Sequence, residues 1–348
     1  MGEDNKFYKY PDIENSYQEG FIEKIRKAGY EDCPYMITEK IHGANSQITY
    51  NVISGEFSYG SRSHFLAEGE KFYNLQGILD SKQEAVKVLA GLLSGDLAAL
   101  GQRVKTVTVY GEVFGGAYPH PDVVLDKTAN KVQKGVYYCP SNDWLAFDVS
   151  YTVIGSDKNY FLGGDKFFSM CVCCGVDTVP MLVIAKNLTA ALAYKDDMPS
   201  RVYRKYRLPK LDDNIMEGIV IRPASADVWL GDHRVILKKK NEKFKEKKEA
   251  KKNTEPVALP EGVAKACEEI SQFITVNRVH NVISHIGEVG PKDVGRVIME
   301  TAKDVLADYR KEYDTLDKLE KKDEKLVTKF MNGEVAKIVR DVVIFGKG

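Results

Sequence analysis

Residues 38–53 read Thr-Glu-Lys-Ile-His-Gly-Ala-Asn-Ser-Gln-Ile-Thr-Tyr-Asn-Val-Ile, and this stretch indicates the fold class of the first part of the chain. Its second half, from Ser46 to Ile53, is rich in residues that favour β-strands. Its first half places Lys40 three residues before Gly43, and a glycine there lets the backbone approach a ligand closely. The stretch therefore predicts a lysine presented where a β-rich run begins.

Working outward from this stretch, β-rich runs alternate with turn signals and a few helical patterns from about residue 35 to 240. The strands that we expect are 46–53, 104–110, 144–149, 218–222 and 234–238. The helices that we expect here are 15–27, 82–93 and 164–171. Together they predict an α+β domain of packed antiparallel sheets with flanking helices.

The C-terminal part of the chain has a different pattern, with apolar residues at three- and four-residue spacing. The helices expected there are 262–277, 281–286, 291–313 and 319–343. Between the two parts, the sequence is strongly basic and poor in apolar residues, which is typical of an exposed linker. We therefore predict a first domain over 1–246, a basic linker over 247–258 and a small all-helical domain over 259–348.

Composition sets limits on size and partners. The chain has 348 residues, of which 43% are hydrophobic, so it can bury the cores of two domains. Fifty lysines and arginines balance fifty aspartates and glutamates, and any surface for a polyanion must therefore be local.

The cysteines and the N-terminus favour a cytoplasmic protein. Six cysteines lack regular spacing, and no signal peptide or membrane-spanning apolar stretch is recognisable, so we expect free thiols and no membrane. Cys171-Val-Cys-Cys174 could in principle bind zinc, but no second pair of ligands stands at suitable spacing. We expect a buried strand there instead.

Two groups of lysines could carry phosphate chemistry. A deprotonated Lys40 could attack a phosphorus atom, and the alternative is an ordinary surface lysine. In the run Val235-Ile-Leu-Lys-Lys-Lys240, strand alternation would put Lys238 and Lys240 on one face and Lys239 on the other. Two ammonium groups on one face favour an anion site, and the alternative is an edge strand guarded by lysines.

Two carboxylates and one aromatic ring complete the set. Glu112 and Glu217 each stand beside a glycine at a predicted strand boundary, where they could hold a ribose hydroxyl or Mg²⁺. The alternative for both is a solvated strand-end charge. Phe147, inside a predicted strand, could stack on a purine or could simply belong to the core.

Taken in order, these segments resemble the motifs of the covalent nucleotidyltransferases, the superfamily of polynucleotide ligases and mRNA capping enzymes. Glu39-Lys-Ile-His-Gly-Ala-Asn45 resembles the RNA ligase 2 family, which includes bacteriophage double-strand RNA ligases and kinetoplastid editing ligases. Thr275-Val-Asn-Arg-Val-His-Asn-Val-Ile-Ser-His-Ile-Gly-Glu-Val-Gly-Pro-Lys-Asp293 is similar to the C-terminal domain of the phage-type enzymes. Capping enzymes and DNA ligases carry an OB-fold there. The resemblance implies an ATP-grasp-like ligase fold for the first domain.

The resemblance also implies roles for individual residues. Lys40 would be the adenylylated nucleophile, with His42, Lys238 and Lys240 as the other catalytic residues. Glu112 and Glu217 would hold the metal. The set implied to bind ATP or AMP is Glu39, Lys40, Ile41, Asn45, Arg62, Glu112, Phe147, Glu217, Lys238 and Lys240.

In the helical domain, Arg278, Asp304 and Asp308 fall where the phage-type enzymes use an arginine and two acids during sealing. Because Asp304 and Asp308 lie one helical turn apart, the alternative is an exposed helical face, which the pattern alone slightly favours.

The function implied is an ATP-dependent RNA ligase that seals 3′-OH/5′-phosphate nicks through lysyl-AMP and RNA-adenylate, as in RNA repair. Its cofactors would be ATP and Mg²⁺, with Mn²⁺ as a substitute. The expected substrate is nicked double-stranded RNA or an RNA/DNA hybrid, bound by a monomer in the cytoplasm, or in a host cell if the chain is phage-encoded. The alternatives are a single-strand RNA or DNA ligase of the same superfamily, which the helical C-terminal domain disfavours, and a non-catalytic RNA-binding relic of the fold.

Overall fold

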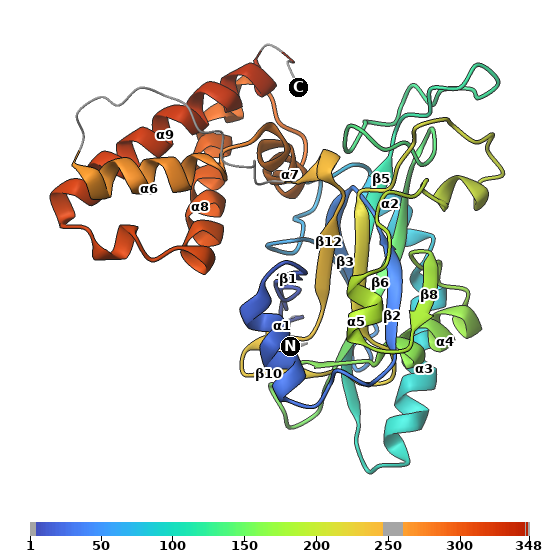
Figure 1. Cartoon of the computed structure of the whole chain (residues 1–348). Coiled ribbons are helices and arrows are strands. Elements are labelled where there is room, and N and C mark those ends of the chain that lie inside the picture. Colours follow the sequence, from blue (N-terminus) through green and yellow to red (C-terminus); the bar gives the residue numbers. More distant parts are fainter. Residues whose placement is uncertain (1–4, 246–259, 345, 347–348) are drawn as a thin grey trace. The chain divides into compact units, whose positions relative to one another are not determined.

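The computed structural model describes residues 5–245, 260–344 and 346. Within it the chain forms two compact units, Met1–Lys243 and Phe244–Gly348 (Figure 1). The first contains two five-stranded sheets and one short two-stranded sheet, and the second is helical, which confirms the predicted α+β class. The predicted linker, 247–258, lies outside the described residues.

The first sheet of the N-terminal unit has five strands and is mostly antiparallel. In spatial order its strands are β1 (Glu14–Asn15), β12 (Leu237–Lys240), β9 (Gly218–Pro223), β2 (Tyr35–Lys40) and β8 (Met181–Ala185). Only β1 runs parallel to its neighbour. The predicted strand 234–238 is divided, because β11 (His233–Arg234) pairs instead with β10 (Trp229–Leu230).

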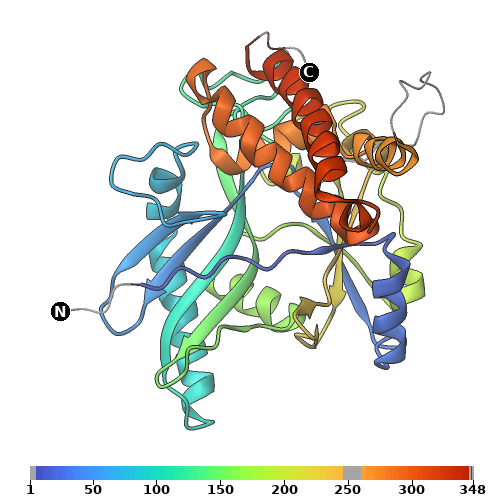
Figure 2. The same cartoon turned by 90° about the vertical axis from the view of Figure 1, so that its left-hand side faces the viewer.

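The second sheet of the unit also has five strands, all antiparallel to their neighbours. In spatial order they are β4 (Phe57–Ser61), β3 (Ala44–Asn51), β5 (Val104–Gly115), β6 (Asn142–Val153) and β7 (Tyr160–Phe161). The three residues 41–43 connect β2 to β3 and so carry the chain from one sheet to the other (Figure 2).

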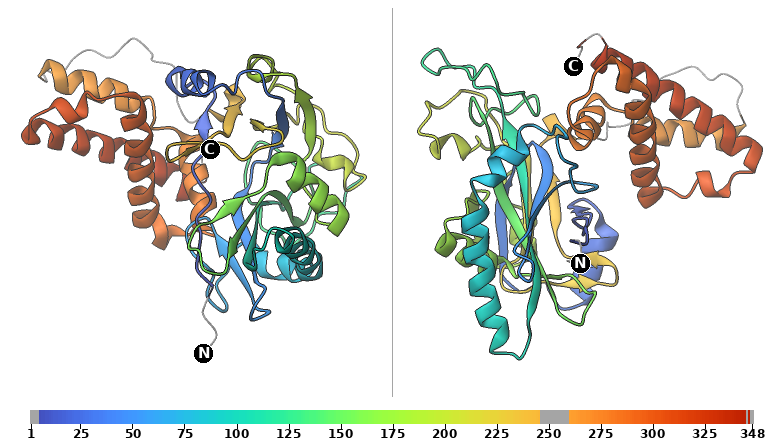
Figure 3. Two further views of the ribbon diagram at one scale, coloured as in Figure 1. Left: turned by 90° about the horizontal axis from the view of Figure 1, so that it is seen from below. Right: turned by 180° about the vertical axis from the view of Figure 1, so that it is seen from behind.

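Helices pack against one face of each sheet, as the apolar patterns require. Those on the first sheet are α1 (Glu19–Lys27) and α5 (Leu188–Leu192). Those on the second sheet are α2 (Leu75–Asp80), α3 (Gln83–Ala98) and α4 (Gly164–Cys174). Alternation along β5 sends Val107, Val109 and Val113 into the core under α3, so Tyr110 and Glu112 point to the other face. Figure 3 shows α3 lying along this sheet.

The strand predicted at Cys171–Cys174 is wrong, because these residues form the last turn of α4. Phe167, Met170 and Cys171 recur at helical spacing and pack into the core. Gly175 then ends the helix in the left-handed region at φ +72°. All six cysteines are free thiols.

Among its described residues, the C-terminal unit has four main helices around one apolar core. They are α6 (Glu261–Ser271), α7 (Val276–Ile286), α8 (Val294–Glu312) and α9 (Lys321–Val343). The long α9 contacts each of the other three. The prediction of a single helix over 262–277 is wrong, because the helix ends at Ser271. Thr275 begins a new helix, where its side chain accepts a hydrogen bond from the backbone N–H of Arg278 at 3.2 Å.

Single turns of 3₁₀-helix complete the described elements. They are η1 (Val202–Arg204), η2 (Glu242–Phe244), η3 (Pro291–Asp293) and η4 (Leu316–Lys318). Across the described part of the chain, no helix combines the length and the apolar character that crossing a membrane requires.

Candidate active site

Strand register brings three predicted site residues together in the N-terminal unit. Gly218, the first residue of β9, lies opposite Lys40 of β2 on one side and Lys240 of β12 on the other. Glu217 directly precedes Gly218 and therefore stands between the two lysines. The sheet accommodates no side chain at Gly218, since a Cβ there would lie 2.1 Å from the backbone oxygen of Lys239.

Three basic groups converge on the carboxylate of Glu217, and we call these four residues the Glu217 cluster. Oε2 of Glu217 lies 2.7 Å from Nζ of Lys40 and 3.6 Å from Nδ1 of His42, while Oε1 lies 3.0 Å from Nζ of Lys240. The Glu217 side chain is only 2% exposed. Burial alone would raise its pKa, but Lys40, Lys240 and His42 hold the pKa of Glu217 well below its usual range. The carboxylate is thus kept ionised by its neighbours.

The lysine run at the end of β12 divides between two faces, as alternation predicts. Nζ of Lys239 donates to the backbone oxygens of Leu192 and Tyr194 at 3.2 and 2.7 Å, on the side of α5. Lys240 points the other way, to Glu217. Lys238 shares the face of Lys240 by strand geometry and lies about 7 Å along it.

The turn after Lys40 is fixed by residues from a distant loop. The backbone N–H of His42 donates to the hydroxyl of Tyr138 at 2.8 Å, and Nε2 of Gln133 donates to the backbone oxygen of Gly43 at 3.3 Å. A Cβ at Gly43 would stand 2.1 Å from the backbone oxygen of Val113 and 2.8 Å from Cγ of Glu112. The glycine is therefore required by the close approach of β5.

Glu112 faces the lysine from the second sheet. It lies opposite Asn45 in the register of β3 and β5, and its Oε1 accepts from the backbone N–H of Gly43 at 3.2 Å. Burial raises the pKa of Glu112 to about 7; Glu217 adds to the rise, whereas Lys40 and Arg62 oppose it. A carboxyl group with this pKa can hold or release a proton near neutrality.

Glu39 lies next to the nucleophile candidate but in a different environment. Its side chain is buried, and Oε2 accepts from the backbone N–H of Arg201 at 2.9 Å. Burial raises the pKa of Glu39 to about 7 against the hydrogen bonds from Ser200 and Arg201. Among the described residues, its Oε1 has no hydrogen-bond partner. One buried acceptor is therefore left for a ligand.

Phe147 occupies an irregular position in β6. The register between β5 and β6 shifts there, since Tyr110 pairs with Asp148 and Gly111 pairs with Ala146, which leaves Phe147 unpaired in a bulge. The half-buried Phe147 ring meets Tyr10 edge-on at 5.0 Å between centroids. The bulge can aim a side chain out of the regular alternation, as a stacking residue needs.

A buried ionic network underlies Phe147. Asp148 accepts from Tyr10 at 2.9 Å, lies 3.1 Å from Nη1 of Arg222 and pairs with Arg234. Arg222 lies on β9 of the first sheet, Arg234 on β11 and Asp148 on β6 of the second sheet, so the network joins the two sheets. The pKa of Asp148 is lowered, because Arg222 and Arg234 outweigh the effect of burial.

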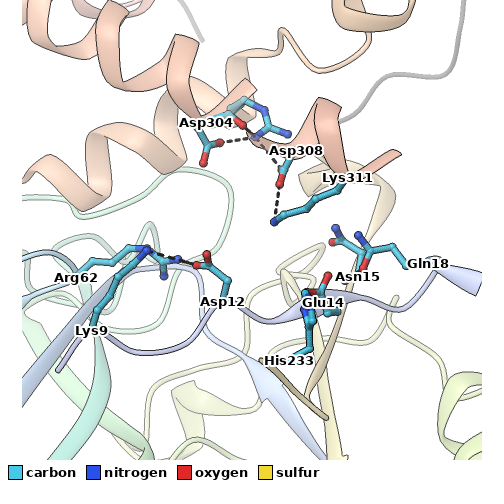
Figure 4. A network of polar contacts seen from close by, with 11 residues as sticks. Lys9, Asp12, Glu14, Asn15, Gln18, Arg62, His233, Asp304, Asp308 and Lys311 are labelled. Atoms are coloured by element: carbon cyan, nitrogen blue, oxygen red, sulfur yellow. Dashed lines mark hydrogen bonds and ion pairs between the residues drawn. The ribbon is translucent and has the colours of Figure 1, made fainter. Parts of the chain in front are cut away.

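The remaining residues predicted in this unit are dispersed around the site. Arg62 follows β4 and pairs with Asp12 at 2.5 Å, and Lys9 lies 3.8 Å from the same aspartate (Figure 4). Ile41 is buried beside the turn, and Asn45 is buried on β3.

In the C-terminal unit, Arg278 on α7 and the two acids Asp304 and Asp308 on α8 meet, and we call these three residues the Arg278 cluster. Nη1 of Arg278 pairs with Asp304 and lies 3.0 Å from Oδ2 of Asp308, while Nε donates to the backbone oxygen of Phe273 at 2.9 Å. Asp308 also lies 3.1 Å from Nζ of Lys311 (Figure 4). Spacing alone slightly favoured an exposed face for both acids; their side chains are 37% and 20% exposed, and both carboxylates also hold the buried guanidinium of Arg278.

Sequence reasoning missed the residues that support the site. Tyr138 and Gln133 lie in a long loop without periodicity, so no local signal marked them. Asp148 and Arg222 did carry a signal, because each is a charged residue inside a run of strand-forming residues. Such a charge within a buried strand requires a partner.

Comparisons with known proteins assign both units. The RNA ligase family model matches residues 34–240, and the T4 RNA ligase 2 C-terminal model matches residues 257–337. The mitochondrial RNA-editing ligase 1 of Trypanosoma brucei brucei is 25% identical over 362 residues, covering 86% of this chain and 74% of the relative. The mitochondrial RNA-editing ligase 2 of Trypanosoma brucei brucei (strain 927/4 GUTat10.1) is 29% identical over 164 residues, covering 43% of this chain and 38% of the relative.

Solved structures of Naegleria gruberi RNA ligase are also similar. A mutant with ATP and Mn gives a TM-score of 0.43 at 16% identity, and the form with PPi gives 0.41 at 15%. Each alignment covers 70% of this chain and 59% of the Naegleria chain, so this chain spans less than two thirds of that protein. From the two family models, this chain belongs to the RNA ligase family and is an ATP-dependent RNA ligase with a C-terminal part of the T4 RNA ligase 2 type.

Proposed function

We propose that this RNA ligase seals nicks in duplex RNA by joining a 3′-hydroxyl to a 5′-phosphate, through Lys40-AMP and an RNA-adenylate. The observation that carries the proposal is the convergence of Lys40, His42 and Lys240 on the one carboxylate of Glu217. Adenylyl transfer requires a nucleophilic amine, basic side chains that can stabilise phosphate charge and a carboxylate that positions them. The T4 RNA ligase 2 C-terminal match favours a duplex substrate over a single strand.

The charges of the pocket suit a triphosphate. Two lysines offset one carboxylate within the Glu217 cluster, and Lys238 adds a third ammonium group on the same face of β12. The pocket therefore has surplus positive charge in a partly buried setting, where the charge is screened less by solvent. Lys238 and Lys240 would hold the β- and γ-phosphates.

In the first step, the Nζ lone pair of Lys40 attacks the α-phosphorus of ATP. An N–P bond forms, the bond from the α-phosphorus to the bridging oxygen breaks, and pyrophosphate leaves with that electron pair. An amine held by a carboxylate keeps its proton, so Lys40 must leave Glu217 and lose a proton before it attacks. Lys240 stays on Oε1 and keeps Glu217 in place.

The carboxylates of Glu112 and Glu217 fit a divalent cation that arrives with the phosphates. In the described residues, no group of three or more His, Cys, Asp or Glu side chains is placed to hold a metal on its own. Mg²⁺ commonly uses only one or two carboxylates together with phosphate oxygens and water, so two suffice. Mg²⁺, or Mn²⁺ in its place, would offset charge on the phosphates.

Residues on both sheets would hold the nucleoside. Oε1 of Glu39 offers a buried acceptor to the exocyclic amine of adenine. Phe147 would stack on the base from its bulge, and Glu112 would accept from a ribose hydroxyl. Arg62 would contact phosphate after leaving Asp12. Ile41 and Asn45 would line the same site.

The two later steps use the same pocket. The 5′-phosphate of the nick attacks the phosphorus of Lys40-AMP, Lys40 leaves, and an RNA-adenylate forms. The 3′-hydroxyl then attacks the 5′-phosphate and AMP leaves. The proposed boundaries assign 1–246 to adenylyl transfer and 259–348 to RNA binding and sealing, with Arg278, Asp304 and Asp308 supporting the latter. The basic link 247–258, which lies outside the described residues, would contact phosphates.

The test of adenylyl transfer is labelling with α-³²P-ATP and Mg²⁺, followed by a denaturing gel. We expect label on the native chain, its removal by pyrophosphate and no label on Lys40→Ala. Lys40→Arg is the matched control, because it keeps a positive charge beside Glu217 without an amine of the same reactivity, and it should also stay unlabelled. A native chain that does not label, once its mass has excluded prior adenylylation, would favour the RNA-binding relic.

The test of substrate class compares nicked duplex RNA, a nicked RNA/DNA hybrid, single-stranded RNA and nicked DNA. We expect the first two to be sealed fastest. A chain that ends at Thr254 should still label at Lys40 but should not seal nicks. Faster joining of single strands, or normal sealing by the shortened chain, would contradict the duplex assignment and the division of labour respectively.

A further inference from the structure

A second basic region lies outside the Glu217 cluster. Residues 201–210 read Arg-Val-Tyr-Arg-Lys-Tyr-Arg-Leu-Pro-Lys and contain five cations and two tyrosines. The whole chain carries no net charge, so this stretch is a strong local concentration of positive charge. We call it the basic loop. None of the roles assigned above uses its side chains.

Hydrogen bonds place the basic loop at the rim of the active site. The loop leaves the fold after Ser200 and returns at Asn214, and the backbone N–H of Ser200 donates to the oxygen of Asn214 at 3.0 Å. Closer to the sheet, the backbone N–H of Met216 donates to the backbone oxygen of Met198 at 2.9 Å. Met216 directly precedes Glu217, and the loop's first N–H binds Glu39. The base of the loop is therefore bonded to Glu39 and adjoins Glu217.

The basic loop is held in one conformation. It begins with η1, and turn hydrogen bonds continue to the N–H groups of Arg207 and Leu208. The hydroxyl of Tyr206 donates to Asp143 at 2.5 Å, and that of the buried Tyr118 donates to the backbone oxygen of Pro209. Arg207 adopts φ +52°, a left-handed conformation that is uncommon outside glycine. The backbone that carries these cations is therefore ordered before a ligand binds, so it loses little entropy on binding.

The cations of the basic loop fall into two groups. Lys205 lies 3.0 Å from Asp143 and 3.2 Å from Asp177, so two carboxylates of the same unit neutralise its charge. Arg204, Arg207 and Lys210 are exposed, and within the described ranges none of the three forms an ion pair. Arg204 instead lies over the Tyr203 ring, 5.9 Å from its centroid. These three charges remain available to a ligand.

We propose that Arg204, Arg207 and Lys210 bind backbone phosphates of the RNA strand that enters the active site. This inference rests on the proposed function, because RNA must reach Lys40-AMP and the ends of the loop adjoin Glu39 and Glu217. Three exposed cations on a preorganised loop complement a polyanion, and the base edges need no partner there. ATP is the poorer candidate, since Lys40, Lys238 and Lys240 already line the pocket for its phosphates.

The test is a triple variant, Arg204→Ala with Arg207→Ala and Lys210→Ala, in the full chain. Its matched control removes three cations that are also exposed and, within the described ranges, form no ion pair: Lys24, Lys27 and Arg103. Binding to nicked duplex RNA is measured over a range of salt in a Lys40→Ala background, which prevents turnover. Sealing kinetics and α-³²P-ATP labelling are measured with Lys40 intact.

We expect the loop variant to bind RNA about tenfold or more weakly, with the slope of log K against log salt shallower by about 2 to 3. KM for the nick should rise while labelling with ATP stays near the native rate, which also shows that the pocket is folded. Native binding and slope in the loop variant would overturn the inference, as would an equal loss in the control. Failure of the native chain to label would contradict the proposed function instead, and the binding comparison would still test the loop.

Discussion

The Glu217 cluster and the Arg278 cluster follow one plan with the charges exchanged. Each is centred on an ionised side chain that is 2% exposed. In the N-terminal unit, one carboxylate receives two lysines and a histidine; in the C-terminal unit, one guanidinium receives two carboxylates. The first centre therefore has excess positive charge and the second has excess negative charge.

The two clusters differ in whether a neighbouring side chain neutralises their excess charge. Lys311 lies 3.1 Å from Asp308 and supplies the charge that balances the Arg278 cluster within the described residues. In the Glu217 cluster itself, two lysines stand against one carboxylate, which leaves an excess of positive charge. A balanced cluster stabilises a fold, whereas an unbalanced one attracts a ligand of opposite charge. The comparison therefore predicts mainly catalytic effects at Glu217 and mainly stability effects at Arg278.

The largest effect is expected for Glu217→Gln, which keeps the shape of the side chain and removes its charge. Lys40 and Lys240 would then lose the carboxylate that positions them, so the single-turnover rate of labelling by ATP should fall roughly a hundredfold or more. Glu14→Gln is the control, because Glu14 is also buried and pairs with a histidine, His233, in the same unit. A Glu217→Gln rate within a few-fold of native would remove Glu217 from the reaction.

The second prediction concerns Arg278→Ala. It leaves two carboxylates facing each other without their cation and removes a donor to the backbone oxygen of Phe273. Because Asp304 is partly solvated, we expect the free energy of unfolding of the C-terminal unit to fall by about 2–3 kcal/mol. Urea unfolding of the full chain, followed by hydrogen exchange in α7 and α8, measures this.

Lys311→Ala is the control for Arg278→Ala, and its exposed pair should contribute less than about 1 kcal/mol. Labelling of Lys40 should persist in both variants, because neither changes the N-terminal unit. If Arg278→Ala leaves stability unchanged and abolishes sealing alone, the cluster acts on RNA directly and the contrast with the Glu217 cluster is wrong.

The two clusters also show which features could be predicted from the sequence. The strand pattern around Lys40 and the alternation of Lys238, Lys239 and Lys240 are local properties, and both were predictable from residue type and spacing. The same holds for the four C-terminal helices, although the break before Thr275 was missed. Its capping hydroxyl was the available signal.

Partner choice was not predictable, because it depends on contacts between residues far apart in the chain. Lys40 and Glu217 are 177 residues apart; the resemblance implied one site for both, but their direct contact follows only from strand register. The resemblance grouped Asp304 and Asp308 with Arg278, but their spacing alone slightly favoured an exposed face and gave no sign of the contact with Arg278 on another helix. Spacing within one helix gives no information about which neighbour covers it.

The third prediction is a dependence of stability on pH, from Glu39 and Glu112, whose burial outweighs the effect of nearby cations. The pKa values of Glu39 and Glu112 are raised from an ordinary 4.5 to about 7 in the folded chain. Between these values the folded state binds more protons than the unfolded state, so the free energy of unfolding falls as pH rises through the interval. Above pH 7 these groups add no further slope.

Glu39→Gln should remove the part of this pH dependence that Glu39 contributes, a change in the free energy of unfolding of about 2 kcal/mol between pH 5 and 8. Glu112→Gln should remove a similar share, and the double variant should be nearly flat over this range. The lowered pKa of Glu217 has the opposite effect, with stability lost only as pH falls below its ordinary range. Urea unfolding at a series of pH values measures these slopes. A slope that survives in the double variant would place its origin elsewhere.

The smallest effect is expected for Tyr138→Phe, which removes the hydroxyl that accepts from the backbone N–H of His42. The buried N–H loses a neutral hydrogen bond, which corresponds to about 1 kcal/mol and roughly a fivefold slower labelling of Lys40. Tyr35→Phe is the matched control, since its buried ring loses a hydroxyl that donates to Tyr30 at 2.7 Å, away from the pocket. If both variants slow labelling equally, Tyr138 contributes to folding alone. A selective effect would show that the turn after Lys40, and not only the charges around Glu217, sets the geometry of attack.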